Sequence, residues 1–325
     1  FNKANQKLHL ISDRYGFKPL YWGIINNNLV WASELKAFLR HHNFTPIINL
    51  KALREFFYIG QMLEDKTWFR GIALLPPSSI LSYQINENKV DIKQYWSWHN
   101  IHPVTYKFNE SDLLDNIGRL LINSVRRRIN SDHRIGLSLS GGLDSRALLA
   151  AIPKSVKNIH AFTFGAEGSA DFHIAQTLSN IRGSMQYHPL LLTQKNSLKY
   201  RFNGVWQTDG FLNMLHMHGI EFQNVYKENV DILLNGFAGD LVLGGSFLNR
   251  RMFDKKINTI MLSSHNIKQT IFNNWYNINK TDPYFLYNRV RRFTNGGLII
   301  ISKAVEPTMP FFDNELVEFI YSLPD

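Results

Sequence analysis

The stretch SLSGGLDSRALLA, from Ser138 to Ala150, places two adjacent glycines between an apolar run typical of a buried strand and a run with helical spacing. Glycines at such a junction let backbone N–H groups converge on an anion, and the helix N-terminus adds partial positive charge. Bare phosphate would repel Asp144, so this acid indicates a bridging cation such as Mg²⁺. A tight turn with Asp144 as a helix cap is the alternative, but it does not need the serines, glycines and acid together.

Strands and helices alternate on both sides of this loop. RIGLSLS, NIHAFTFG, MQYHPLLL and DILLNG are typical of strands, and LDSRALLAAI and DFHIAQTLSNI are typical of helices. A further helix is predicted upstream, with Ser111 as its N-cap. This alternation predicts a doubly wound parallel α/β sheet, in which ligands bind beyond the carboxyl ends of the strands.

The first third of the chain has a different pattern, typical of an α+β domain. Asn26, Asn27 and Asn28 separate two apolar runs and predict a hairpin, and a second strand pair is predicted to turn at Asn86-Glu87-Asn88. Short helices are expected around residues 33–41 and 49–57. Periodicity weakens between residues 100 and 108, so we predict one domain over residues 1–105 and a second over 106–325.

Composition narrows the classes of function. The chain has no cysteine, which excludes disulfides and thiolate metal sites within it and fits a cytoplasmic protein, and no run is long enough to span a membrane.

The net charge is +10, but the basic residues are scattered. We interpret the two short clusters, Arg126–Arg128 and Arg289/Arg291/Arg292, as solvated helix faces; a polyanionic nucleotide is the alternative partner, and we do not expect nucleic acid. The HxH pair His216/His218 lacks a third ligand for zinc.

The glycine loop is neither a Walker loop nor a dinucleotide-binding fingerprint, because the required glycine spacing and Lys-Ser/Thr ending are absent. SGGLDS instead resembles the pyrophosphate loop of the adenylating ATP pyrophosphatases. Four further segments resemble asparagine synthetase. DRYGFKPLYWG is similar to that family's DRxGxKPLYY segment, WASELKAFL and FRGIALLPPSSIL to later parts of its glutaminase domain, and VEPTMPFFDNELVEFIYSLP to its EVRVPFLDxxLVEFxxxLP segment.

This resemblance implies a fold and a set of site residues. The fold would be a truncated N-terminal-nucleophile amidotransferase domain, followed by an ATP pyrophosphatase domain that is truncated at its C-terminus. Asp13 would hold the amino group of glutamine, Asp144 and Asp240 would bind magnesium, and Glu306 would join both acids in catalysis. The ATP- and pyrophosphate-binding residues would be Ser138, Ser140, Gly141, Gly142, Asp144, Ser145, Phe164, Gly165 and Gly236.

The chain departs from the family pattern at several positions. Phe237 stands where the family has a glutamate, Leu241 replaces an acid, Thr308 replaces an arginine and Ser246 replaces a tyrosine. These positions fall where the acceptor carboxylate should bind. The family's N-terminal cysteine nucleophile is absent, and residue 1 is Phe, so we expect this chain to be a piece of a longer protein.

The function expected from the resemblance is glutamine-dependent synthesis of asparagine. ATP would adenylate the β-carboxylate of aspartate with Mg²⁺ present, and ammonia from glutamine would displace AMP from β-aspartyl-AMP. One alternative is an amide ligase that adenylates another carboxylate, such as a peptide or a glycan-linked acid. Another is a non-catalytic nucleotide-binding paralogue. The expected partners are small molecules, and the chain could form a homodimer.

Overall fold

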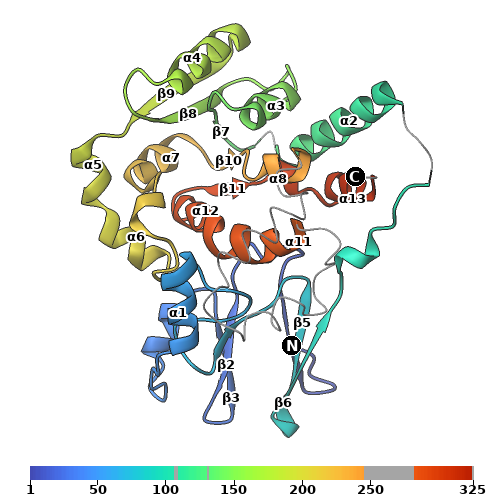
Figure 1. The fold of residues 1–325 in the computed structure, drawn as a ribbon, viewed down its shortest axis with the longest axis vertical. Helices are drawn as coiled ribbons and strands as arrows, with labels where there is room; N and C mark the ends of the chain where they lie inside the picture. The colour runs from blue at the N-terminus through green and yellow to red at the C-terminus, as the bar shows by residue number, and fades with distance from the viewer. Residues whose placement is uncertain (106–108, 130–131, 245–281, 324–325) are drawn as a thin grey trace. The chain divides into compact units, whose positions relative to one another are not determined.

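The computed structural model describes residues 1–105, 109–129, 132–244 and 282–323 (Figure 1). The chain divides into two compact units. Unit 1 comprises Phe1–Asn100, Thr208–Asn213 and Phe247–Gly296, and unit 2 comprises Ile101–Gln207, Met214–Ser246 and Gly297–Asp325. The division into domains at residue 105 stays a prediction.

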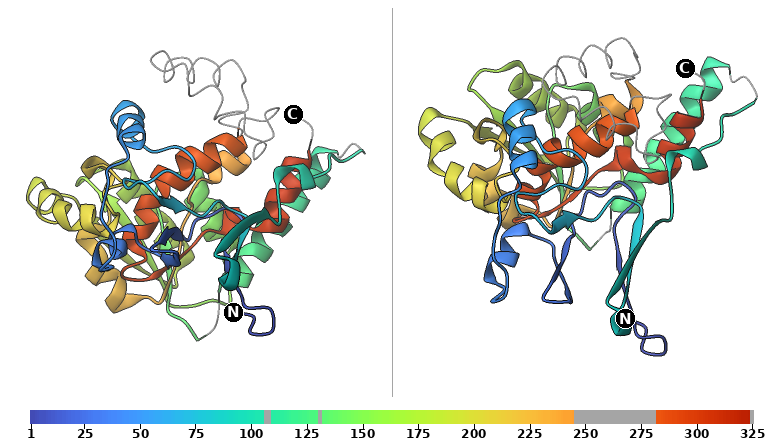
Figure 2. Two further views of the ribbon diagram at one scale, coloured as in Figure 1. Left: turned by 90° about the horizontal axis from the view of Figure 1, so that it is seen from below. Right: turned by 60° about the horizontal axis from the view of Figure 1, so that its bottom comes forward.

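Unit 1 is built on two antiparallel sheets. One has the strand order β1-β5-β6 and the other β3-β2-β4. The strands are β1 (Lys7–Ile11), β2 (Tyr21–Ile25), β3 (Asn28–Ala32), β4 (Ile72–Leu74), β5 (Ser79–Gln84) and β6 (Lys89–Gln94). Alternate residues of β5 are buried, so this sheet presents one apolar face to the core. The chain's first residues lie beside the tip of the β5–β6 hairpin, which Figure 2 shows lengthwise.

Both predicted strand pairs are confirmed, and their turns follow from the residues that form them. Asn26 and Asn27 both have positive φ, 47° and 60°, between paired Ile25 and Asn28. Two positive φ values are what a two-residue type I′ hairpin requires, and asparagine tolerates them better than most residues. The second hairpin turns at a 3₁₀ segment, Ile85–Glu87, and Asn88 there has φ 49°.

Helical segments complete unit 1. The helices expected near residues 33–41 and 49–57 are the 3₁₀ helix η1 (Leu35–Arg40) and α1 (Leu50–Ile59). Later in the chain, α11 (Asp282–Phe285) continues into the π-helix η6 (Leu286–Thr294). Arg291 and Arg292 of this helix are 5% and 7% exposed, and both donate to backbone carbonyl oxygens, of Leu75 and of Lys66. The interpretation of this cluster as a solvated face is therefore wrong.

Unit 2 contains a five-stranded parallel sheet of order β11-β10-β7-β8-β9, which confirms the doubly wound prediction. The strands are β7 (Ile135–Ser138), β8 (Ile159–Gly165), β9 (Met185–Leu191), β10 (Ile232–Leu234) and β11 (Glu306–Thr308). The first three residues of the central strand β7 are buried, as expected for a strand covered on both faces.

Helices connect these strands or flank them in the chain. They are α2 (Glu110–Arg128), α3 (Leu143–Ala151), α4 (Ala170–Arg182), α5 (Gln194–Lys199), α6 (Arg201–Gln207), α7 (Gln223–Asn229), α8 (Gly239–Leu243), α12 (Asn295–Ile301) and α13 (Asn314–Ser322). In Figure 1, α4 runs along β8 and β9, and α2 lies beside α13. Within the described residues, no helix is long and apolar enough to span a membrane.

The start of α2 differs from the prediction by two residues. Asn109, not Ser111, is the N-cap, and its side chain accepts a hydrogen bond from the Asp112 backbone N–H at 2.7 Å. Asn and Ser are both strong N-cap residues, so the sequence offered two starting points of similar quality.

Candidate active site

The candidate site lies where the order of the parallel sheet reverses. The chain proceeds from β7 to β8 and β9 on one side, and β10 then pairs with the other side of β7. In open α/β sheets, ligands bind beyond the carboxyl ends of the strands at such a switch point. The glycine loop follows β7 and the segment from Gly236 to Asp240 follows β10, so both predicted motifs lie at this edge.

The backbone N–H groups of the glycine loop donate hydrogen bonds to side-chain oxygens. The N–H of Ser140 donates to Ser145 Oγ at 3.1 Å, and that of Gly142 donates to Ser140 Oγ at 3.2 Å. The N–H of Gly141 donates to Asp171 Oδ1 at 2.7 Å. The three amides therefore point at oxygen atoms, two of them on hydroxyls that can rotate to serve a ligand.

Ser138 and Ser145 link the loop to its surroundings. Ser145 is 5% exposed, and its Oγ lies 3.0 Å from the carbonyl oxygens of both Ser140 and Gly142, to either of which it can donate. Ser138 ends β7, and its Oγ accepts a hydrogen bond from Asn235 Nδ2 at 3.3 Å. Asn235 directly follows β10, so this contact ties together the two strand ends that carry the site.

Asp144, in the first turn of α3, packs directly on the segment that follows β10. A Cβ added to Gly236 would lie 3.1 Å from Asp144 Cβ, and one added to Gly239 would lie 2.7 Å from Asp144 Cγ. Ala238, between them, has φ 52°, so the chain turns sharply into α8. A side chain at position 239 would displace the Asp144 carboxyl, and one at position 236 would crowd the backbone that carries it.

The carboxyls of Asp144 and Asp240 interact electrostatically. Burial first, and then the negative charge of Asp240, raise the pKa of Asp144, and a hydrogen bond from the Asp240 backbone partly offsets both. Two carboxylates that repel each other at the mouth of an anion loop can hold a hard cation such as Mg²⁺. Within the described ranges, no three His, Asp or Glu side chains gather to hold a metal.

Phe164 and Gly165 end β8, the next strand along the sheet. The Phe164 side chain is 40% exposed, and its ring stacks on His218 with centroids 6.1 Å apart and planes 27° apart. Burial, followed by the charge of Arg201, lowers the pKa of His218. A neutral aromatic shelf with one exposed ring is suited to contact with a planar base.

The residues that depart from the family pattern divide into packed and polar groups. Phe237 is 8% exposed and contacts the ring of Phe312, and Leu241 is 2% exposed. Thr308 ends β11, and its Oγ1 is buried with no hydrogen-bond partner among the described residues. Ser246 lies outside the described residues. Glu306, which matches the family pattern, lies at the amino end of β11, whereas Asp144 and Asp240 follow the carboxyl ends of β7 and β10, so the structure does not bring Glu306 to the same edge of the sheet as these two acids.

In unit 1, the Asp13 carboxylate organises its own turn. Oδ1 accepts the backbone N–H groups of Tyr15 and Phe17, both at 3.1 Å, and Oδ2 accepts that of Lys18 at 2.9 Å. A carboxylate has about four acceptor positions, so these three bonds from described residues leave about one for a further donor.

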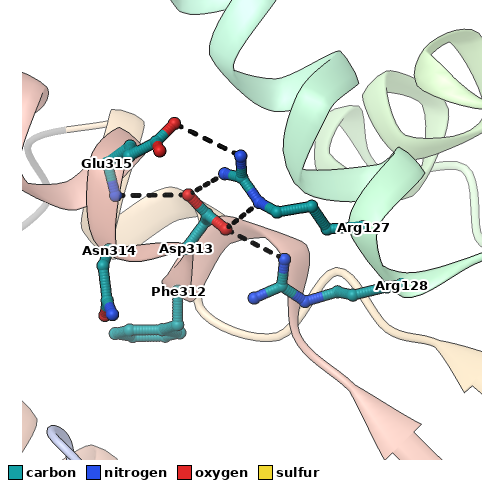
Figure 3. A pocket seen from close by; sticks show the side chains of 6 residues that line it. All are labelled: Arg127, Arg128, Phe312, Asp313, Asn314 and Glu315. Atoms are coloured by element: carbon teal, nitrogen blue, oxygen red, sulfur yellow. Dashed lines mark hydrogen bonds and ion pairs between the residues drawn. The ribbon is translucent and has the colours of Figure 1, made fainter.

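Two arginines of the other basic cluster, Arg126–Arg128, line a pocket of about 480 Å³ in unit 2 (Figure 3). Arg127 and Arg128 line it, and both bind the carboxylate of Asp313, with N–O distances of 2.5 and 3.1 Å. Arg127 also pairs with Glu315 at 3.3 Å. These arginines are therefore neutralised within unit 2 and join α2 to the start of α13.

Three residues of the site were missed by the sequence analysis. Asp171 contacts the loop from α4, Asn235 ties β10 to β7, and Gly239 leaves room for Asp144. Asn235 directly precedes the predicted Gly236, and Gly239 directly precedes Asp240. Their positions next to predicted site residues could have identified both as part of the site. For Asp171 the sequence offered only an acid in a first helical turn, which is common in helices.

Comparison with known proteins agrees with this geometry. Residues 1–96 match the model of a glutamine amidotransferase domain, and residues 116–294 match that of asparagine synthase. The chain is 25% identical over 381 residues to the glutamine-hydrolyzing asparagine synthetase 2 of Bacillus subtilis, covering all of this chain and 50% of that protein. It is 26% identical over 202 residues to the human glutamine-hydrolyzing asparagine synthetase, covering 59% and 34%. It is also 25% identical over 259 residues to amidase chyE of Penicillium rubens, covering 73% and 38%.

The chain spans half or less of the length of these relatives. The asparagine synthase match nevertheless covers more than half of the chain and contains the glycine loop, Asp144 and Asp240. The chain belongs to the asparagine synthase family.

Proposed function

We propose that this chain carries the ATP-cleaving site of a glutamine-dependent asparagine synthetase. The observation that carries the proposal is the contact of Asp144 with Gly236 and Gly239, which places its carboxyl beside Asp240 at the mouth of the glycine loop. Mg²⁺, when bound between these acids, would neutralise the charge of the phosphates.

The reaction assigned to the site begins with attack of an aspartate β-carboxylate oxygen on the α-phosphorus of ATP. The bond from the α-phosphorus to the bridging oxygen breaks, and pyrophosphate leaves with the electron pair. Ser140, Gly141 and Gly142 supply amides and hydroxyls for the charge that develops on this leaving group. Ammonia then attacks the acyl carbon, loses a proton and displaces AMP, which leaves asparagine.

The nucleotide base and the nitrogen donor are assigned to other parts of the chain. The exposed ring of Phe164 and its partner His218 would receive the adenine. Residues 1–96 match a glutamine amidotransferase domain, which supports glutamine as the source of ammonia, and Asp13 would hold its amino group.

One test follows AMP and pyrophosphate with the intact protein, ATP, Mg²⁺, an ammonium salt and aspartate. Aspartate should stimulate the release of both products, and Asp144→Asn or Asp240→Asn should lower the rate about 10²-fold or more. Asp115→Asn is the control, because it removes an exposed acid of α2 in the same unit. Formation of ADP and phosphate would contradict the proposal, and ATP binding without turnover would indicate a non-catalytic paralogue.

A second candidate is an amide ligase with a different acceptor acid. Phe237 and Leu241 are buried apolar residues where the family has acids, and both follow β10 at the site. This difference favours an acceptor unlike free aspartate, such as a carboxylate on a peptide or glycan. Replacement of aspartate by a panel of such acids, with pyrophosphate release as the readout, separates the two candidates.

A further inference from the structure

The glycine loop is already occupied by an acid of its own unit. Of the three side chains that accept its amides, those of Ser140 and Ser145 are neutral hydroxyls, whereas Asp171 is a carboxylate. Hydroxyls can turn to donate to an incoming phosphate, but a carboxylate can only accept. Asp171 therefore occupies the Gly141 amide as an anionic ligand would.

The contact forms where the glycine loop lies close to α4. Asp171 lies in the first turn of α4, where a negative charge is favoured by the helix N-terminus. A Cβ on Gly141 would lie 2.7 Å from Asp171 Oδ1 and 2.8 Å from Ile174 Cδ1. The loop thus lies against the side-chain ends of Asp171 and Ile174, and the carboxylate stays on the amide unless its side chain rotates away.

We infer that the Asp171 carboxylate competes with pyrophosphate for the Gly141 amide and so weakens binding of that product. This inference rests on the proposed function, because it takes the loop to hold pyrophosphate. A bound phosphate must either displace the carboxylate from the amide or lie beside it as a like charge. Cleavage of ATP adds a negative charge to the departing pyrophosphate, so the repulsion is greatest after the reaction and favours release.

The test measures binding of inorganic pyrophosphate to the intact protein by calorimetry, with excess Mg²⁺ and again with EDTA. Asp171→Asn removes the charge but keeps an oxygen that can accept the Gly141 amide. Since Asp171 is exposed to solvent, we expect its loss of charge to lower Kd by about three- to tenfold, and we expect this difference to shrink at high salt. Glu167→Gln is the control, because it removes an exposed acid from the loop before α4 and should leave Kd unchanged.

Each outcome decides the inference. An equal or higher Kd for Asp171→Asn would overturn it, as would an equal gain from Glu167→Gln. Asp171→Ala provides a second variant in case the first does not fold, and it should also bind pyrophosphate more tightly than the parent. If no form binds pyrophosphate, the assignment of the loop fails together with the inference. If pyrophosphate binds as expected while aspartate does not stimulate AMP release, only the proposed acceptor fails.

Discussion

The Asp144 carboxyl lies so close to Gly239 that a Cβ there would be 2.7 Å from its Cγ and 2.9 Å from its Oδ1. A residue that follows β10 therefore sets the position of an acid that follows β7. The position of the Asp144 carboxyl therefore depends on the absence of a side chain at Gly239, and substitution of this glycine tests that dependence.

Gly239→Ala should displace Asp144 and lower the rate of pyrophosphate formation about 10²-fold, because small misplacements of reacting groups have effects of this size. Phe311 lies 2.9 Å from the added carbon, so outward relaxation is limited. Steady-state kinetics, with cooperative unfolding as a check of folding, measure the effect.

Gly118→Ala is the matched control for that variant. Gly118 lies in α2, and a Cβ added there would meet no atom of the described residues within 4 Å beyond its own stretch of helix. This variant should keep full activity and gain about 0.5–1 kcal/mol in free energy of unfolding, since alanine is the better helix former. Equal activity of Gly239→Ala and Gly118→Ala would show that Asp144 does not depend on this close approach.

Asp313→Ala should lower the free energy of unfolding by about 2 kcal/mol. The variant removes the N-cap of α13 and leaves Arg127 and Arg128 without their shared carboxylate. The loss is limited because 44% of the Arg127 side chain is exposed. Urea unfolding of Asp313→Ala and Asp313→Asn measures it, and the asparagine variant should lose less because it can still cap the helix.

The same residue predicts a dependence of stability on acid. Burial raises the pKa of Asp313, but the hydrogen bonds and charges of Arg127 and Arg128 outweigh it, and the net shift is downward. A carboxyl with a depressed folded-state pKa stabilises the fold above its unfolded pKa of about 3.9, and this contribution is lost as pH falls through the folded value. The Asp313→Asn variant should therefore lose less stability than the parent between about pH 5 and pH 2.

His160 and His188 should make unit 2 sensitive to a milder fall in pH. Their rings stack with centroids 5.2 Å apart, and His160 Nδ1 lies 3.0 Å from His188 Nε2. Burial, together with Arg134, lowers the pKa of His160, and burial together with His160 lowers that of His188. The neutral pair fits the fold, so stability should fall as pH drops below the unfolded histidine pKa of about 6.5.

Urea unfolding at several pH values below 7 checks this dependence. His188→Gln should flatten the fall in stability, whereas His173→Gln, which alters an exposed residue of α4, should leave it unchanged. An unaltered slope in His188→Gln would show that other groups cause the acid sensitivity.

Asp209→Ala should destabilise unit 1 by about 2 kcal/mol, because it leaves two part-buried backbone N–H groups without this acceptor. The Asp209 carboxylate accepts the backbone N–H groups of Leu35 and Lys36 at 2.7 and 3.1 Å, and pairs with Lys36 Nζ at 3.2 Å. Its side chain is 8% exposed. Thermal unfolding measures the loss, and Asp91→Asn, which removes an exposed acid of β6, should have little effect.

The sequence predicted the parts of the site that depend on local order along the chain. The glycine loop lies between an apolar strand and a helix, and Asp240 closely follows another apolar strand, so their meeting at one sheet edge follows from the parallel arrangement. The contact of Asp171 with Gly141 spans 30 positions and depends on how closely α4 packs. No periodicity in the sequence encodes that distance.

The buried arginines show a second limit. Arg291 and Arg292 have the composition of a solvated face, but their guanidinium groups donate to the backbone carbonyls of Leu75 and Lys66. Those carbonyls belong to a segment more than 200 residues away, so only the folded chain reveals the acceptors. Charge pattern alone predicts exposure, because arginine is rarely buried unless it is paired.

The most direct test of the central claim follows oxygen from the acceptor into AMP. The intact protein is given ATP, Mg²⁺, ammonium and aspartate labelled with ¹⁸O in its β-carboxylate, and the AMP is analysed by mass spectrometry. Attack of the carboxylate on the α-phosphorus, followed by displacement with ammonia, predicts one ¹⁸O atom in each AMP formed with asparagine. Unlabelled AMP, or ADP in its place, would contradict adenylation of aspartate at the Asp144–Asp240 site.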